Sequence, residues 1–94
     1  MTETLKIGVI GCGSISRRHM EASTRLEDVE ITAASSRAST SLDEVSRDYG
    51  LSNLFSDWRE LVQCDAVDAV LICLPDGLHE EVTLDAARHG KHVL

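Results

Sequence analysis

The sequence predicts an α/β protein built on a doubly wound parallel sheet. Short apolar runs rich in β-branched residues alternate along the chain with segments whose apolar residues recur at helical spacing. The apolar runs lack the polar alternation of strands with one exposed face, so we expect helices to cover both faces of the sheet. Because strands separated by helices pair in parallel through right-handed crossovers, this alternation favours a doubly wound sheet.

Four segments have the composition of strands. Residues 5–10 form a short apolar run that Gly11 stops, and residues 29–34 form a second, β-branched run. Residues 67–74 are apolar almost throughout, so this strand is expected at the centre of the sheet beside residues 5–10. Residues 29–34 are expected on the other side of residues 5–10, and residues 92–94 have the pattern of a further strand that is only beginning.

Helices are predicted after the first and second strands. Apolar residues from Ile15 to Leu26 lie close to helical spacing, and Ser14 stands where a helix-capping residue is expected. Residues 38–49 carry apolar side chains at offsets of four, three and four, which form one face of a helix. Gly50 follows directly, and glycine is typical of helix C-termini.

Two more helices are predicted before and after the third strand. Residues 57–60 have the form of a capping box that opens a short helix. Residues 78–89 have one apolar face at helical spacing, and Gly90 closes that helix. The predicted order of elements is therefore β-α-β-α-α-β-α-β.

The composition excludes several classes of partner. The chain of 94 residues has a formal net charge of -7, whereas binding to nucleic acid or to an anionic membrane needs a basic patch. The longest apolar run, residues 69–74, is far too short to span a bilayer, and an acidic residue stands where a signal peptide needs a basic one. The cysteines, Cys12, Cys64 and Cys73, have no metal-ligand spacing, which indicates buried thiols in a reducing compartment. We therefore expect a cytoplasmic protein with no metal, nucleic-acid or membrane partner.

A glycine-rich turn joins the first strand to the first helix. Its pattern is G-x-G-x-x-S over residues 11–16, with serine where a third glycine is usual. Gly11 permits the tight turn, Gly13 lets the backbone approach a pyrophosphate, and a small third residue lets the helix lie against the strand. The free N–H groups of the helix start, near Ser14 and Ile15, would then face the phosphates. The context predicts a Rossmann dinucleotide-binding fold; the alternative is a glycine-rich turn that holds no ligand.

The end of the second strand bears on the choice between NAD and NADP. A carboxylate that accepts hydrogen bonds from the ribose of NAD is expected about 20 residues beyond the motif. Ser36 stands there instead and is followed by Arg37. A hydroxyl donates to a phosphate and a guanidinium pairs with it through a rigid fork, so this pair favours NADP. Otherwise Arg37 is an ordinary surface arginine that stacks on adenine or faces water.

Several segments together resemble the Gfo/Idh/MocA oxidoreductases, which include glucose–fructose oxidoreductase and inositol dehydrogenases. The segments are KIGVIGCGSI (residues 6–15), RH (18–19), ASSR (34–37), YG (49–50), DW (57–58), VDAVLICLPDGLH (67–79) and GKHVL (90–94). The resemblance covers the whole chain. It implies an N-terminal Rossmann domain, a C-terminal α/β domain, and hydride transfer between a nicotinamide and a sugar or polyol carbon.

The resemblance also implies cofactor contacts after the third strand. Leu74, Pro75 and Asp76 match a segment that lies against the cofactor, although the family carries asparagine where Asp76 stands. His79 matches a histidine on the nicotinamide side of the cleft. The alternative for His79 is that it only caps the helix that follows.

In the family a Glu-Lys-Pro segment with the catalytic lysine directly follows the position of Leu94, where this chain ends. We therefore expect residues 1–94 to be an incomplete Rossmann domain with no catalytic residue of its own. A small-molecule substrate would be held through a second domain that this chain lacks. Exposed sheet edges favour a homo-oligomer. Two other functions stay open: a sensor that holds NADP without catalysis, and an interaction domain that has lost its ligand.

Overall fold

The computed structural model describes residues 4–11, 14–23, 25–51, 53–74 and 76–94, with the side chains of residues 14–16 and 76 left aside. Within these ranges the chain forms a parallel five-stranded sheet in the order β3-β2-β1-β4-β5. The strands are β1 (Leu5–Ile10), β2 (Val29–Ser35), β3 (Asn53–Phe55), β4 (Ala69–Ile72) and β5 (His92–Val93). The helices are α1 (Ser14–Ser23), α2 (Ser39–Tyr49), α3 (Trp58–Leu61) and α4 (Asp76–Arg88). This is the doubly wound α/β class that the alternating pattern predicts.

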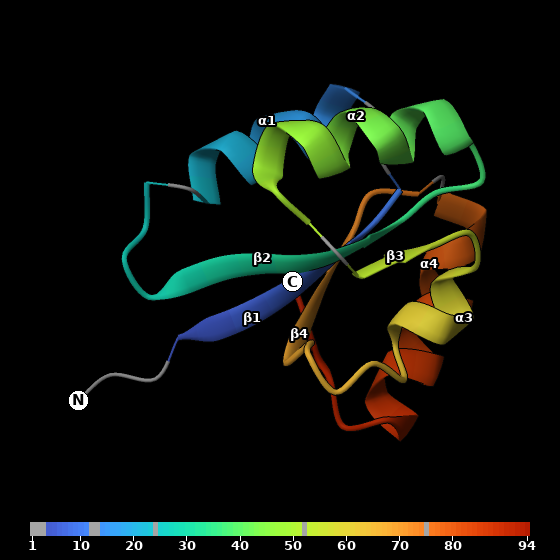
Figure 1. The fold of residues 1–94 in the computed structure, drawn as a ribbon. Coiled ribbons are helices and arrows are strands. Elements are labelled where there is room, and N and C mark those ends of the chain that lie inside the picture. Colours follow the sequence, from blue (N-terminus) through green and yellow to red (C-terminus); the bar gives the residue numbers. More distant parts are fainter. Residues whose placement is uncertain (1–3, 12–13, 24, 52, 75) are drawn as a thin grey trace.

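Both faces of the sheet are covered, as the absence of polar alternation predicts. Figure 1 shows α1 and α2 on one face and α3 and α4 on the other. Neighbouring strand residues point to opposite faces, so Val9 packs under the first helix pair and Ile10 under the second. The first core consists of Ile7, Val9, Met20, Ala34, Leu42, Val45 and Leu51. The second consists of Ile10, Ala33, Trp58, Leu61, Val62, Val67, Val70, Ile72, Val82 and Ala86.

The predicted centre of the sheet is confirmed, but its third predicted strand is shorter than residues 67–74. β1 pairs in parallel with β2 on one side and with β4 on the other. The β1–β4 ladder runs from the Ile7–Ala69 pair to the Ile10–Ile72 pair. It ends there because β1 gives way to Gly11, whose φ of 92° turns the chain out of the sheet.

The structure corrects the sequence analysis at two elements. The strand β3 was not predicted, because three half-buried residues at the sheet edge carry too little pattern. The first helix ends at Ser23, so Leu26 lies beyond it and is 58% exposed rather than buried. The Ser23 hydroxyl donates to the carbonyl of His19 at 2.6 Å, a local bond of the kind that competes with further helix.

Other predicted ends are where the sequence places them. Gly50 follows α2 in the left-handed conformation, with φ of 67°, and its N–H donates to the Ser46 carbonyl. Asp57 caps α3 by accepting a hydrogen bond from the N–H of Arg59 at 2.9 Å. None of the helices in the described ranges is long and apolar enough to cross a membrane.

Candidate functional site

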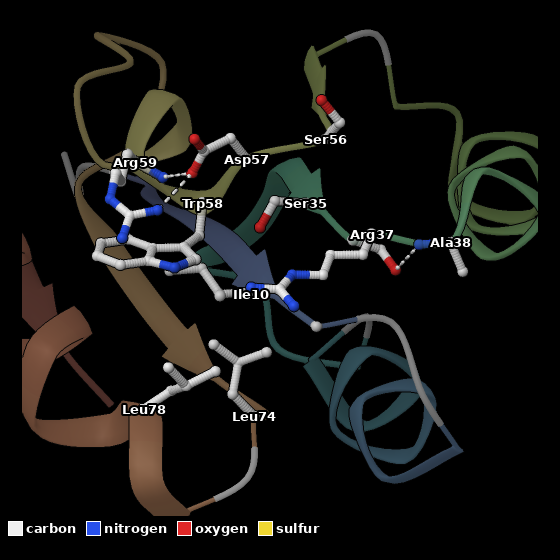
Figure 2. Close-up of a pocket in the computed structure, with 12 residues that line it drawn as sticks. Ile10, Ser35, Arg37, Ala38, Ser56, Asp57, Trp58, Arg59, Leu74 and Leu78 are labelled. Carbon is white, nitrogen blue, oxygen red and sulfur yellow. Dashed lines mark hydrogen bonds and ion pairs between the residues drawn. The ribbon is translucent and has the colours of Figure 1, made fainter.

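A cleft of about 540 Å³ opens at the carboxyl edge of the sheet, where β1, β2 and β3 end. In open α/β sheets this edge is where ligands bind. Its walls come from the turns after these strands, from the turn after β4 and from the starts of α3 and α4 (Figure 2). The lining residues are Ile10, Gly11, Ser35, Ser36, Arg37, Ala38, Ser56, Asp57, Trp58, Arg59, Leu74 and Leu78.

The floor of the cleft is the turn after β1, where only glycine fits. Gly11 has a φ of 92°, and its N–H donates to the Ser35 carbonyl at 2.9 Å. A Cβ on Gly11 would lie 2.6 Å from the backbone oxygen of Cys73, so the β4 end packs directly against this turn. The first helix begins a few residues on, at Ser14, and its leading N–H groups lack intrahelical partners. This edge therefore offers hydrogen-bond donors and the positive end of a helix dipole to an anion.

The structure describes only some of the residues that are predicted to bind phosphate. Gly13 is outside the described residues. Ser14 and Ile15 are described by their backbone alone, as the first two residues of α1. The structure thus brings Gly11 and the start of α1 to the same edge, and the contacts of the other positions stay a prediction.

The end of β2 places Ser36 and Arg37 together on one wall. The Ser36 N–H donates to the Phe55 carbonyl at 3.2 Å, which ties this wall to β3. The Ser36 hydroxyl oxygen accepts the Ala38 N–H at 3.2 Å, so the hydroxyl proton is left to donate elsewhere. Arg37 is exposed, and Figure 2 shows its side chain pointing into the cleft. The structure records no ion pair or hydrogen bond of this guanidinium with any other described residue.

The facing wall was not predicted as part of the site. The Arg59 guanidinium lies over the Trp58 ring, 4.6 Å from its centroid. The same guanidinium pairs with Asp57 at 3.4 Å and with Glu81 of α4 at 2.9 Å. These residues follow β3, and a sequence analysis that misses β3 has no reason to place them at the ligand edge. The capping box over residues 57–60 marks this segment but predicts only a helix start.

The turn after β4 forms the remaining wall. Leu74 and Leu78 line the cleft, and the N–H of Cys73 donates to the Ile10 carbonyl at 2.8 Å. His79 is half-buried, and its Nε2 lies 2.7 Å from the Leu74 carbonyl oxygen. His79 is not among the described residues that border the cleft. Pro75 is outside the described residues, and Asp76 is described only as the first backbone residue of α4.

The charges at the cleft suit an anionic ligand. Among the described lining residues there are two guanidiniums, Arg37 and Arg59, and one carboxylate, Asp57, although the chain as a whole has a net charge of -7. Since Arg59 is already paired with two carboxylates, Arg37 is the lining cation that is available to a ligand. Burial raises the pKa of the Cys73 thiol, which disfavours a thiolate anion beside the cleft. Among the described residues no group of three or more His, Cys, Asp or Glu side chains is arranged to hold a metal ion.

A glycine turn between strand and helix, in a parallel sheet with a cleft at its carboxyl edge, defines the class of nucleotide-binding Rossmann domains. Residues 5–94 match the model of the Gfo/Idh/MocA oxidoreductases, described as an oxidoreductase family with an NAD-binding Rossmann fold. The chain therefore belongs to this family and forms its NAD(P)-binding domain. The expected family, fold class and cofactor class are all confirmed.

Similar proteins include several inositol dehydrogenases. A scyllo-inositol 2-dehydrogenase (NADP(+)) from Bacillus subtilis is 34% identical over 90 residues, which cover 96% of this chain and 27% of that protein. A myo-inositol 2-dehydrogenase from Thermotoga maritima is 34% identical over 89 residues, with 95% of this chain covered and 27% of that protein. The chain thus spans about a quarter of the length of these curated relatives.

Solved structures repeat the fold closely. The scyllo-inositol dehydrogenase of Lactobacillus casei, with bound NAD(H) and scyllo-inositol, has a TM-score of 0.92 at 33% identity, covering 97% of this chain and 27% of that one. A 3-ketoreductase from Actinomadura kijaniata, in complex with NADP and TDP-benzene, has a TM-score of 0.90 at 34% identity, covering 98% of this chain and 28% of that one.

Proposed function

We propose that this chain binds NADP in the carboxyl-edge cleft and is the cofactor domain of an enzyme that oxidises or reduces a polyol or sugar carbon. The observation that carries the choice of NADP is the Arg37 guanidinium, which points into the cleft and has no partner among the described residues. A guanidinium and a hydroxyl on adjacent residues match a 2′-phosphate, which carries extra charge and acceptor oxygens.

The strand order assigns parts of the cofactor to parts of the chain. β2 and β3 lie on one side of β1, and β4 lies on the other. Ser36 and Arg37, which follow β2, would therefore hold the adenosine end. The Gly11 turn and the start of α1 would hold the diphosphate, and Leu74, after β4, would border the nicotinamide half. The predicted contacts of Gly13, Ser14, Ile15, Pro75 and Asp76 belong to this same proposal.

When bound, the nicotinamide supplies the hydride-accepting or hydride-donating carbon. The residues of this chain bind and orient the cofactor, and none of the described ones is placed to move the substrate proton. Lys6 is the second residue of β1 and Lys91 precedes β5, so both lysines lie at the amino edge, away from the cleft. The Lys91 ammonium is already bonded to the carbonyls of Cys64 and Val67. We therefore expect residues 1–94 to bind NADPH without turning over a substrate.

The substrate class rests on the relatives. Inositol dehydrogenases recur among them, and one solved relative holds scyllo-inositol itself. A cyclic polyol or a sugar is thus the substrate class we propose for the enzyme.

The decisive experiment is calorimetry of the chain with NADPH and with NADH. We expect NADPH to bind at least about tenfold more tightly, because a charge-assisted hydrogen bond contributes about 1.5–3 kcal/mol. Arg37→Ala should remove most of that difference and leave NADH binding nearly unchanged. Arg47→Ala, a change at an exposed arginine in the last turn of α2, is the matched control and should alter neither affinity. Equal or tighter binding of NADH by the unaltered chain would refute the preference for NADP.

We also propose that the protein works in the cytoplasm as a homo-oligomer. The described cysteines, Cys64 and Cys73, are free thiols, which suits a reducing compartment. Leu84 on α4 is a large apolar side chain left exposed, and exposed apolar surface recruits partners. Light scattering at rising concentration tests the oligomer, and a chain that stays monomeric throughout would count against it.

A further inference from the structure

We propose that His79 is a positioning residue that holds the turn after β4 against the nicotinamide half of the cofactor, and that it does so through the Leu74 carbonyl. This inference rests on the proposed function. It assigns His79 a role that differs from direct contact with the cofactor and from capping the last helix for stability alone.

The geometry of the bond defines which ring nitrogen carries the proton. The Nε2 of His79 lies 2.7 Å from the Leu74 carbonyl oxygen. A carbonyl oxygen only accepts, so Nε2 must donate, and the neutral ring is then the Nε2–H tautomer with a bare Nδ1. The ring is half-buried in the first turns of α4 and reaches back past the start of its own helix.

The carbonyl that His79 holds belongs to a residue of the cleft wall. Leu74 lines the cleft, and its Cδ2 lies 3.2 Å from the point where a Cβ on Gly11 would stand. The backbone of Cys73, one residue earlier, is already held because its N–H donates to the Ile10 carbonyl at 2.8 Å. Pro75, one residue later, has no N–H to donate. The His79 ring therefore supplies the bond that orients the Leu74 peptide beyond the end of the β1–β4 ladder.

The strand order predicts which half of the cofactor depends on this bond. Leu74 follows β4, whereas the adenosine end is assigned to β2, on the far side of β1. Loss of the His79 bond should thus weaken binding of the whole dinucleotide and spare adenosine 2′,5′-bisphosphate, which contains only the adenosine half. A residue that merely supports the fold would not separate the two ligands.

The test compares both ligands by calorimetry in the unaltered chain and three variants. His79→Phe keeps a planar ring but removes the donor, and we expect NADPH to bind about five- to tenfold more weakly with adenosine 2′,5′-bisphosphate unchanged. His79→Gln places an amide N–H at a similar reach and should restore NADPH binding to within about threefold. His89→Phe is the matched control, because His89 also bonds a carbonyl, that of Asp85 at 2.9 Å, but at the far end of α4. It should leave both affinities unchanged.

Three results would overturn the proposal: equal weakening of both ligands in His79→Phe, no weakening of either, or a failure of His79→Gln to restore binding. If the unaltered chain binds neither ligand, the proposed function itself is wrong and this role falls with it.

Nitrogen NMR of the His79 ring in the unaltered chain is a second test, and it does not depend on the folding of any variant. A protonated Nε2 with a bare Nδ1 is expected, and a proton on Nδ1 in the neutral ring would refute the assignment.

Discussion

Lys91 and Arg37, two cations at opposite edges of the sheet, differ in whether other described residues bond to them. At the amino edge a hollow of about 440 Å³ contains Lys91, whose ammonium donates to the carbonyls of Cys64 at 2.8 Å and Val67 at 2.6 Å. The Asp68 carboxylate at the same edge accepts the N–H of Lys6 at 3.0 Å. At the carboxyl edge the cleft is of similar size, but Arg37 points into it and bonds to no other described residue.

The difference separates charges that stabilise the fold from a charge that is available to a ligand. A hollow lined by a cation does not by itself predict an anion site. The amino edge has such a hollow, but the Lys91 ammonium there is already bonded to two backbone carbonyls. At the carboxyl edge the helix start and the glycine turn add donors that point outward. Removal of the Lys91 ammonium at the amino edge should thus change stability, and removal of the Arg37 guanidinium at the carboxyl edge should change binding.

The largest effect is expected at Gly11. Gly11→Ala adds a Cβ 2.6 Å from the Cys73 carbonyl oxygen, at a residue whose φ is 92°. Gly50→Ala, at φ of 67° with open space around the Cβ, is the control and should cost about 1–2 kcal/mol of unfolding free energy. Gly11→Ala should cost more than this control and abolish NADPH binding, whereas Gly50→Ala should leave binding intact. Urea unfolding and calorimetry measure both, and normal NADPH binding by a folded Gly11→Ala chain would contradict the site.

The next largest effect is expected at Lys91. Lys91→Met removes the half-buried ammonium, so the Val67 carbonyl loses its donor and the Cys64 carbonyl keeps only the N–H of Val67. We expect a loss of about 1.5–3 kcal/mol in unfolding free energy, because bonds from a charged donor are stronger than neutral ones. NADPH affinity should not change.

Arg37→Ala should have the opposite effect, with weaker NADPH binding and an unfolding free energy within about 0.5 kcal/mol of that of the unaltered chain. A large stability loss in Arg37→Ala would end the distinction between the edges.

A smaller effect is expected from the ion pair that bridges α3 and α4 beside the cleft. The side chains of Arg59 and Glu81 are both more than half exposed, and Arg59 Nη2 lies 2.9 Å from Glu81 Oε1. Exposed pairs contribute about 0.2–1 kcal/mol, so a double-mutant cycle of Arg59→Ala and Glu81→Gln should give a coupling energy below about 1 kcal/mol. The coupling should shrink in high salt. A salt-independent coupling above that range would indicate that the cleft wall is far more rigid than its exposure implies.

The smallest effect concerns pH. Burial raises the pKa of the Cys73 thiol, so the folded chain holds this proton more tightly than the unfolded chain. The contribution to stability is complete below the ordinary thiol pKa of about 8.5 and declines as the pH rises above it. In a chain with Cys12→Ser and Cys64→Ser, alkylation of Cys73 at pH 8 should be slower when folded than in urea. Equal rates would show that burial does not protect the thiolate.

Much of the fold follows from pattern, because long buried strands and periodic helices leave strong signals. The central strands β1, β2 and β4 and the end of α2 at Gly50 were all predicted. β3 was missed, since three residues at an edge carry no readable period. Leu26 was misplaced, because an apolar residue near helical spacing does not reveal that the helix has already ended at Ser23.

The candidate site was predictable only where a single segment contains all the residues of a motif. The Gly11 turn and the Ser36–Arg37 pair are local motifs, so the sequence locates them. The Trp58–Arg59 wall depends on the unpredicted β3, and the commitment of Lys91 depends on carbonyls more than 20 residues away. The reach of His79 to Leu74 spans five residues, but its direction is set by the packing of α4 and not by spacing.

The most direct test of the difference between the edges is a titration of the isotope-labelled chain with NADPH, followed by backbone amide NMR. We predict that the shifts concentrate at the carboxyl edge, at Gly11, Ser36 and Arg37, and that the amides of Asp68 and Lys91 stay where they are. Shifts centred on Asp68 and Lys91, with the amides around Gly11 unmoved, would place the ligand at the opposite edge and contradict the account.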